Sequence, residues 1–551
     1  MPTLLPRPAA QETASGEFVL SPDATVSTHP DLVQPALRLQ ERLRAATGFV
    51  LPVELDETPP VTTTEPWSSG IRLDHDPSLA PEAFELDARP GSIRIAASSA
   101  RGGQWAVQAL LQLFPAAVYR RSPVSDVRWA VPATRVQDAP KFPWRGAMLD
   151  VVRHFAPTRD VLRFIDLLAM HRLNTLHLHL TDDQGWRVEI ARYPRLTEVG
   201  GWRPETQVGA AHGSDTDGRP HGGYYTQDDI REIVAYASAR GITVVPEIEL
   251  PGHAQAAVAA YPELGVGDPA AAPTTPWTRW GINPVIFNVE ETTIAFLANV
   301  LDEIVDLFPS EYICIGGDEC PKIQWVEDER TQERMREIGV RDEEELQSWF
   351  VSRIGQHLAS RGRKLLGWDE ILEGGLADGA SVLSWRGRVG ALAAARAGHD
   401  VVACPEDTVY LDYRESDLEA EPIPTGTVTS VEKAYSFDPV PAELDADQAR
   451  HVIGGQANLW TEHIDSMRGL DYRAFPRLAA VAEALWTSGA RDYAEFAPRL
   501  TEHLARLDAA GVEYRHADGP RPWQERPGVS GRTRSAEEAA AHLARITANI
   551  G

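Results

Sequence analysis

Two adjacent carboxylates, Asp318 and Glu319, follow a short apolar run in "YICIGGDECPK" (residues 312–322). Paired acids suit acid–base chemistry, in which one group donates a proton while the other stabilises developing charge. Neighbouring side chains point to opposite faces of a strand, so the two acids can serve one site only where the backbone leaves the extended conformation. Gly316 and Gly317 come directly before them and permit such a turn.

Seven further apolar runs also end in polar, charged or aromatic residues, and amphipathic helical patterns fill most of the gaps between them. The eight runs are residues 146–153, 175–183, 242–250, 312–319, 364–370, 381–387, 400–407 and 452–462. Strand–helix alternation predicts parallel strands, and eight repeats predict a closed (β/α)8 TIM barrel of the α/β class. An open doubly wound sheet is the alternative, but no GxGxxG pattern follows the first run.

The ends of these runs carry residues that could act together. Active sites of (β/α)8 barrels lie at the C-terminal ends of the strands, so we expect one mouth to collect the side chains found there. They are Asp150, Arg153, Asp182, Asp183, Glu249, His253, Asp318, Glu319, Trp368, Asp369, Trp385, Arg386, Trp460 and Glu462. Paired carboxylates beside aromatic walls are typical of glycoside hydrolysis, in which one acid protonates the leaving oxygen and positive charge develops on the sugar.

A metal site is the competing interpretation of the same mouth. His177 and His179 alternate in "HLHL" and therefore share one strand face, as histidines do in barrel metallohydrolases. Such sites also need histidines from later strands, and there the runs offer Trp368 and Trp385 instead. We favour histidines that are hydrogen-bonded inside the barrel.

The pattern of apolar residues and the composition divide the chain into three parts. Residues 1–138 carry the helical and alternating patterns of a small α+β domain, and a stretch rich in proline and turn residues closes it. Residues 139–490 hold the eight runs of the barrel. Residues 491–551 contain two helical patterns, the second opened by a capping box from Ser535 to Glu538, and are predicted to form a helical extension packed on the barrel.

The length, net charge and apolar stretches of the chain limit the kinds of partner it can have. A chain of 551 residues with a formal charge of −27 does not favour nucleic acid or an anionic membrane, because both attract clustered Lys and Arg. No stretch reaches the roughly 18 apolar residues of a membrane helix. The N-terminal residues lack the apolar core of a signal peptide, so we expect a cytoplasmic protein, with secretion open if a signal has been removed. A monomer or a homodimer is expected.

The ordered motifs resemble one known family, the glycoside hydrolase family 20 β-N-acetylhexosaminidases. The resemblance covers roughly residues 130–490, and the preceding α+β unit is similar to the non-catalytic domain of these enzymes. The matching motifs, in the family's order, are "WRGAMLDVVRHF", "NTLHLHLTDDQGWR", "PEIELPGHAQA", "GGDEC", "LLGWDE", "SWRG", "YLDY" and "GGQANLWTE".

The resemblance implies a retaining exo-hydrolase in which the substrate's own 2-acetamido oxygen attacks the anomeric carbon. By motif, Glu319 is the expected general acid/base, with a raised pKa. Asp318 is expected to hold the acetamido N–H and stabilise an oxazolinium intermediate, and Tyr410 to donate to the acetamido oxygen. His253 and Asp182 are expected to form a supporting relay behind Glu319.

The resemblance also implies a binding site for a terminal N-acetylhexosamine, GlcNAc or GalNAc, on a small oligosaccharide or glycoconjugate. Trp368, Trp385 and Trp460 are expected to surround the acetyl methyl group, and Arg153 to bind ring hydroxyls. Two carboxylates are expected to help at the hydroxyls, namely Glu462 and, near the 6-hydroxyl, Asp412. No cofactor and no metal are implied. The alternatives are a non-catalytic carbohydrate-binding relative and a metal-dependent barrel hydrolase.

Two positions depart from the family's pattern. Glu249 stands where the family usually has Asp, and we expect its extra methylene to alter the rate or the pH profile through Asp318. Cys320 is an unusual neighbour of the acid pair, and the expected role is that of a small buried hydrophobe. The other cysteines, Cys314 and Cys404, make an odd total of three, which does not build a disulfide framework.

Overall fold

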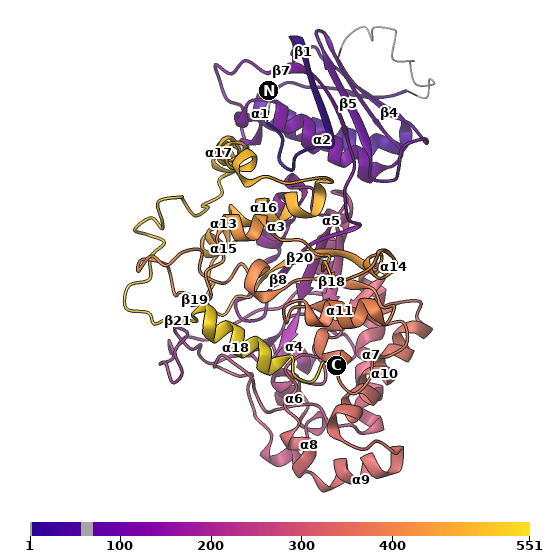
Figure 1. Ribbon diagram of the computed structural model, residues 1–551, viewed down its shortest axis with the longest axis vertical. Helices are drawn as coiled ribbons and strands as arrows, with labels where there is room; N and C mark the ends of the chain where they lie inside the picture. The colour runs from indigo at the N-terminus through magenta and orange to yellow at the C-terminus, as the bar shows by residue number, and fades with distance from the viewer. Residues whose placement is uncertain (1–2, 57–69, 551) are drawn as a thin grey trace.

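The computed structural model describes residues 3–56 and 70–550 and shows two bodies, one above the other in Figure 1. The upper body is a sheet whose lower face is covered by helices α1 (Val33–Thr47) and α2 (Ala100–Leu113). The lower body is the barrel with its helices. The long helix α17 (Tyr493–Ala510) returns to the junction and contacts residues 116–119 of the upper body.

The upper sheet has seven strands in the order β1-β7-β5-β6-β4-β2-β3. Their bounds are β1 Ala10–Val19, β2 Val26–Thr28, β3 Val53–Leu55, β4 Gly70–His75, β5 Phe84–Arg89, β6 Ser92–Ala97 and β7 Ala130–Asp138. The strands β6, β4, β2 and β3 run parallel, whereas β5 and β7 pair antiparallel with their neighbours. Helix α1 ends where Gly48 takes a left-handed conformation (φ +76°), as a helix-terminating glycine does.

The eight apolar runs form eight parallel strands that close into a barrel, which confirms the predicted fold class. In chain order the strands are β8 Trp144–Asp150, β9 Thr175–His179, β14 Thr243–Glu247, β15 Tyr312–Cys314, β16 Lys364–Trp368, β17 Ser381–Ser384, β18 Val401–Ala403 and β20 Val452–Leu459. Every residue of β8 and β9 is buried, because such strands are covered on both faces.

Helices cover the outside of the barrel and complete the alternation. The larger ones are α3 Thr158–Met170, α5 Gln227–Ser238, α7 Glu291–Leu307, α9 Glu329–Ile338, α10 Glu343–Ser360, α11 Val389–Arg396, α15 Met467–Ala474 and α16 Arg477–Trp486. In α3 the apolar residues Val161, Ile165 and Leu168 recur at helical spacing and are buried against the barrel. Because these helices cover the sides of the barrel, a site is expected at the C-terminal ends of its strands.

The last helix, α18 (Ala536–Ile546), begins with the predicted capping box, in which Ser535 and Glu538 bond reciprocally. It crosses the barrel in Figure 1, and the carbonyl of Ile546 accepts a hydrogen bond from Arg386 at 2.6 Å. The C-terminal residues therefore contact the upper body through α17 and the barrel through α18.

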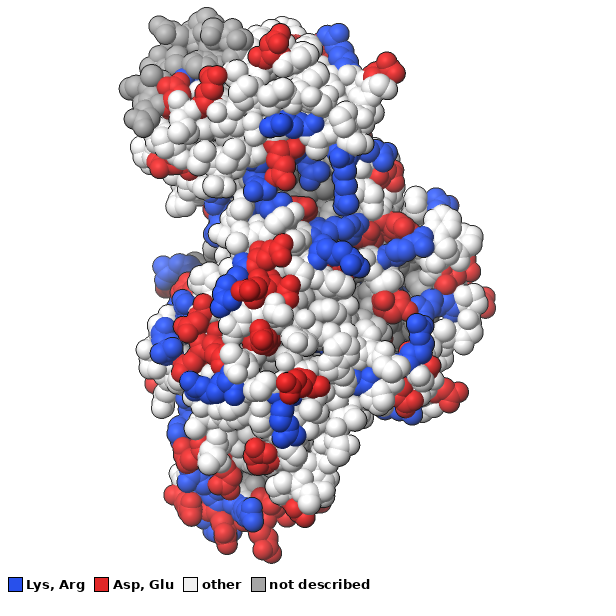
Figure 2. Space-filling view, turned by 180° about the vertical axis from the view of Figure 1, so that it is seen from behind, with Lys and Arg blue, Asp and Glu red and all other residues white. Residues whose placement is uncertain are grey.

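The surface carries both signs of charge. On the face shown in Figure 2, Lys and Arg side chains are interspersed with Asp and Glu, and several gather where the upper body meets the barrel. Within the described residues, no helix is both long enough and apolar enough to span a bilayer.

Candidate active site

The two adjacent acids leave the strand through a left-handed turn. Strand β15 ends at Cys314, and the following backbone has φ +65° at Gly316, +92° at Gly317 and +45° at Glu319. Glycine adopts such angles freely, whereas Glu319 is held there at a cost in strain that is common at functional sites. Adjacent residues of a regular strand would point to opposite faces, but this turn brings both Asp318 and Glu319 close to the imidazole of His253.

The glycine before the acids is also required by space. A Cβ at Gly316 would lie 1.7 Å from the Oε2 atom of Glu249, and one at Gly317 would lie 2.6 Å from Cγ2 of Ile371. The paired glycines therefore allow both the backbone turn and the close approach of β15 to its neighbours.

The imidazole of His253 lies between two pairs of acids. Its Nε2 atom is 3.6 Å from Asp318 Oδ2 and 3.8 Å from Glu319 Oε2. Its Nδ1 atom is 3.0 Å from Asp183 Oδ2 and 3.3 Å from Asp182 Oδ1. The structure thus brings together His253, Asp182 and Glu319, and adds Asp183 as the nearest carboxylate.

The charges of this cluster support one another. Burial alone would lower the pKa of His253, but the charge of Asp182 and hydrogen bonds to carboxylates hold it well above its usual value. Burial likewise opposes the charge of Asp182, yet Arg153 and His253 hold the pKa of that carboxyl well below its usual range. Asp182 and His253 therefore form an ion pair at neutral pH.

Glu319 behaves differently from Asp182 although both contact His253. Desolvation within the mouth raises the pKa of Glu319 to about 7, even though 36% of its side chain is exposed. The charge of His253 opposes this rise and the charge of Asp318 adds to it. A carboxyl with this pKa carries its proton part of the time near neutrality, as a general acid requires.

Aromatic rings surround the space beside these acids. The ring of Trp368 lies 5.9 Å from that of Trp460, and Trp385 stacks on Tyr410 at 6.2 Å with an angle of 28° between the planes. Tyr410 lies 6.4 Å from Trp460 and links the two pairs. The three predicted tryptophans and Tyr410 thus form one aromatic wall. Trp368 is the last residue of β16, Trp385 and Trp460 directly follow β17 and β20, and Tyr410 lies in the segment after β18.

Arg153 lies beside this wall, with its guanidinium carbon 4.9 Å from the centre of the Trp460 ring. It lies 2.6 Å from Asp182, 3.4 Å from Asp150 and 4.0 Å from Glu462, and its Nε donates to Gln184 at 2.9 Å. Burial disfavours the guanidinium charge, but these carboxylates raise its pKa well above the usual value. The arginine is therefore a fixed cation with its donors spread in a fork.

Asp412 and Glu462 carry protons more readily than ordinary acids. Burial, with the charge of Glu462, raises the pKa of Asp412 to about 8, and burial also raises the pKa of Glu462. The Oδ1 atom of Asp412 is buried without a hydrogen-bond partner. A protonated carboxyl can both donate and accept, which suits hydroxyl groups of a sugar.

Three acids of the site were not singled out by the motifs. Glu247, two residues before Glu249, is fully buried and accepts from Trp368 Nε1 at 2.8 Å and from Cys314 at 3.2 Å. Glu370 accepts from Trp385 Nε1 at 3.0 Å. Asp183 was found only as a strand-end residue. The signal for Glu247 was the i, i+2 spacing in "PEIE", which places both glutamates on the barrel's inner face.

The paired histidines of β9 bind to this hidden acid. His177 Nε2 lies 3.2 Å from Glu247 Oε2, and His179 contacts both Glu247 and Asp182. Both histidines are fully buried. The cluster has the residue types of a metal site, and His179 is hydrogen-bonded directly to both Glu247 and Asp182.

Glu249 stands out as a buried acid without donors. It is 1% exposed, and neither carboxylate oxygen has a hydrogen-bond partner. Burial, together with the charges of Asp318 and Glu247, raises its pKa well above the usual value. The fold therefore favours the uncharged form of Glu249 beside Asp318. Cys320 is also buried, and burial raises the pKa of its thiol to about 12, so it is a neutral group as well.

The mouth of this closed (β/α)8 barrel holds two adjacent acids, a histidine that is ion-paired with carboxylates, and an aromatic wall. This combination of fold and site is that of a glycoside hydrolase. The family model described as "Glycosyl hydrolase family 20, catalytic domain" matches residues 142–489, and "Glycosyl hydrolase family 20, domain 2" matches residues 1–139. This chain belongs to glycosyl hydrolase family 20.

Individual relatives agree with the family model. A beta-hexosaminidase of Porphyromonas gingivalis is 41% identical over 96% of this chain, which spans 65% of that protein's length. A beta-N-acetylhexosaminidase of Cellulomonas fimi is 33% identical over 94% of this chain and 97% of the relative. The crystal structure of a Vibrio harveyi exo beta-N-acetylglucosaminidase in complex with N-acetylglucosamine has a TM-score of 0.79 and 34% identity, covering 93% of this chain and 78% of that one.

Proposed function

We propose that this protein is a retaining exo-β-N-acetylhexosaminidase that removes terminal β-linked GlcNAc or GalNAc by substrate-assisted catalysis. The observation that carries the proposal is the division of labour within one acid pair. Asp318 and Glu319 are neighbours in sequence and share His253, and burial raises the pKa of Glu319 to about 7, as a proton donor needs.

In the first step, Glu319 gives its proton to the glycosidic oxygen as the bond from the anomeric carbon to that oxygen breaks. The acetamido oxygen of the same sugar forms a new bond to the anomeric carbon, so no enzymic nucleophile is needed. The acetamido nitrogen becomes positively charged, and Asp318 accepts its N–H and stabilises that charge.

In the second step, the Glu319 carboxylate takes a proton from water, and the water oxygen bonds to the anomeric carbon. The bond to the acetamido oxygen breaks, and two inversions give net retention. His253 lies within 4 Å of both acids, and its positive charge limits how far the pKa of Glu319 can rise. Asp182 and Asp183 keep that imidazole charged and oriented.

The walls of the site provide the selectivity. The aromatic wall of Trp368, Trp385 and Trp460 suits the acetyl methyl group, and Tyr410 donates to the acetamido oxygen. Arg153 is the donor for ring hydroxyls, with Glu462 at 4.0 Å beside it, and Asp412 lies within reach of the charge of Glu462. An open cavity of about 380 Å³, lined in part by Glu462 and by residues 206–209, 217 and 219–221, leaves room for the rest of a glycan or glycoconjugate.

The test is hydrolysis of a chromogenic β-GlcNAc glycoside beside the matching β-glucoside. We expect Glu319→Gln to lower kcat by roughly 10²–10⁴-fold, the usual contribution of a general acid. Asp318→Asn should lower it by roughly 10²–10³-fold, because one stabilising contact to the transition state is lost. Asp306→Asn, on the exposed face of α7, is the matched control and should have no effect.

Two outcomes would contradict the proposal. Equal turnover of both glycosides by the wild type would exclude assistance by the acetamido group. An inactive wild type that still binds GlcNAc would indicate a binding protein instead of an enzyme.

A further inference from the structure

The upper sheet places two histidines and an aspartate at one edge, away from the barrel's mouth. Strands β6, β4 and β2 are parallel neighbours, so their C-terminal ends meet at the same edge. His29 follows β2 and opens the short helix η1 (Pro30–Leu32), which contains Asp31, while His75 is the last residue of β4. In α/β sheets this edge is where ligands are commonly bound.

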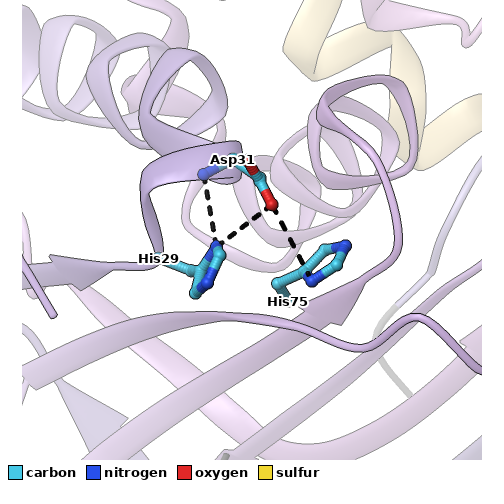
Figure 3. Close-up of side chains that lie close together, drawn as sticks. All are labelled: His29, Asp31 and His75. Atoms are coloured by element: carbon cyan, nitrogen blue, oxygen red, sulfur yellow. Dashed lines mark hydrogen bonds and ion pairs between the residues drawn. The ribbon is translucent and has the colours of Figure 1, made fainter. Parts of the chain in front are cut away.

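The three side chains point toward a common point, as Figure 3 shows. Asp31 Oδ2 lies 3.5 Å from His29 Nδ1 and 3.9 Å from His75 Nδ1. All three atoms lie within 4.8 Å of one another, and the two imidazole rings stack at 5.1 Å with 25° between their planes. Each atom is one that can bind a metal ion.

The hydrogen bonds around the cluster fix which nitrogens carry lone pairs. His75 Nε2 lies 3.1 Å from the carbonyl oxygen of Ser98, which only accepts, so the proton is on Nε2 and the Nδ1 lone pair faces Asp31. His29 Nδ1 accepts the backbone N–H of Asp31 at 3.2 Å and therefore also carries a lone pair. Three electron-pair donors thus converge, and a proton on His75 Nδ1 would be too far from Asp31 for a hydrogen bond.

We propose that His29, Asp31 and His75 form a binding site for one divalent transition-metal ion of the zinc type. Ligand atoms about 2.0–2.1 Å from a tetrahedral zinc ion lie roughly 3.3–3.4 Å apart, so the observed 3.5 and 3.9 Å require only small side-chain movements. The bond from His75 Nε2 to Ser98 is the outer contact that metal-binding histidines usually make.

The exposure of the cluster suits an ion that enters from solvent. The side chains of His29, Asp31 and His75 are 31%, 60% and 27% exposed, which leaves space for water as a fourth ligand. The ion takes over the lone pair of His29 that now accepts one backbone N–H at the start of η1. It ties β2 and η1 to β4, so its effect falls on the stability of the upper body and not on the reaction in the barrel.

The clusters in the barrel do not provide a separate metal site. His177, His179 and Glu247 are fully buried and pair with one another inside the barrel. His253, Asp318 and the partly exposed Glu319 already belong to the candidate active site. A surface pair, His451 and Asp400 at 3.6 Å, has one histidine fewer and a similar exposure. That pair provides a control for weak binding at an isolated histidine and carboxylate.

The experiment is calorimetric titration of the full chain with zinc chloride after removal of metals by a chelator. We expect the wild type and His451→Ala to bind one more equivalent of zinc than His75→Ala. Asp31→Asn should weaken that equivalent by at least about 100-fold, since even losing an outer contact commonly costs 10–100-fold. Zinc should also raise the unfolding temperature of the wild type and His451→Ala, and not that of His75→Ala.

Circular dichroism at the titration temperature shows that each variant is folded, and hydrolytic activity should not change because the barrel's mouth is unchanged. The proposal is wrong if the wild type, His75→Ala and Asp31→Asn bind the same number of zinc equivalents with the same affinity. It is also wrong if the two substitutions change only the pH dependence of stability and zinc has no effect, since the three groups would then share a proton and not a metal.

Discussion

Two buried acids, one in each body of the molecule, differ in whether their carboxyl oxygens have partners. In the upper sheet, Asp74 is 3% exposed and receives the guanidinium groups of both Arg72 and Arg94. In the barrel's mouth, Glu249 has no donor to either oxygen, and Asp318 has none to Oδ1. Because unpaired buried polar groups are costly, the mouth is a place where stability has been exchanged for groups that await a substrate.

The largest effect is expected from a substitution at Gly316, in the turn that makes room for Glu249. Gly316→Ala places a methyl group 1.7 Å from the Glu249 carboxylate and strains a left-handed backbone. We expect a loss of about 3 kcal/mol or more in the free energy of unfolding, and activity reduced at least 100-fold through misplaced acids. Chemical denaturation and the kcat for a chromogenic substrate measure both effects.

Gly339 provides the matched glycine. It has φ +78° at the end of α9, but a Cβ there meets nothing within 4 Å. Gly339→Ala should cost only about 1 kcal/mol, the usual effect of alanine in a left-handed turn, and leave kcat unchanged. If the two substitutions had equal effects, the close contact between Gly316 and Glu249 would not matter.

The contribution of the ion-paired acid, Asp74, is tested by a substitution in the upper sheet. Asp74→Asn leaves the guanidinium groups of Arg72 and Arg94 without their shared carboxylate. Arg72 keeps its ion pair with Asp56 at 2.7 Å and the side chain of Arg94 is 23% exposed, so we expect a loss of about 1.5–3 kcal/mol in the free energy of unfolding, the usual contribution of hydrogen bonds to charged groups. Activity at a temperature where the variant is folded should equal that of the wild type, because the sheet does not contact the mouth. A loss of kcat in the folded variant would contradict this separation.

Replacing the carboxyl of Glu249 by an amide should increase stability, whereas the same replacement at Asp74 should decrease it. Burial raises the pKa of this acid well above its usual value, so the folded protein keeps a proton that the unfolded chain releases above about pH 4.5. Its contribution to stability is therefore lost as the pH rises above that value. Glu249→Gln removes this loss, and the unfolding temperature at pH 8 should rise relative to the wild type.

The effect of Glu249→Gln on the reaction should be the smallest of these changes. The raised pKa of Glu249 favours its uncharged form, which Gln resembles in shape and charge, so kcat should change by less than about tenfold. Thermal unfolding at pH 5 and pH 8 beside kcat at pH 6 would show both. A destabilised variant at pH 8 would mean that Glu249 is ionised and paired, contrary to this account.

Much of the fold could be predicted from the sequence because its signals are local. Each of the eight strands follows from a short apolar run, and Gly316 and Gly317 marked the turn before the acids. The boundaries of strands were less accessible: β15 ends at Cys314, before the polar residues that closed the predicted run. Hydrogen bonding to neighbouring strands decides where pairing stops, and a single run does not contain that information.

The candidate site could be predicted as a set of residues but not as a network. The motifs identified His253 and Asp182, whereas the nearest carboxylate to the imidazole is Asp183. Glu247 was overlooked because its role depends on His177 and Trp368, which come from distant runs. Which oxygen is paired and which is left without a donor is decided by three-dimensional contacts among several strands.

The most direct test of the central claim is the pH dependence of kcat/KM for a β-GlcNAc glycoside. Glu319 acts in its protonated form and has a pKa of about 7, so kcat/KM should fall above pH 7 and approach a tenfold loss per pH unit by pH 8–9. In Glu319→Gln the residual activity should lack this basic limb. A wild-type profile that stays flat to pH 9, or a basic limb that persists in Glu319→Gln, would contradict the assignment of Glu319 as the general acid.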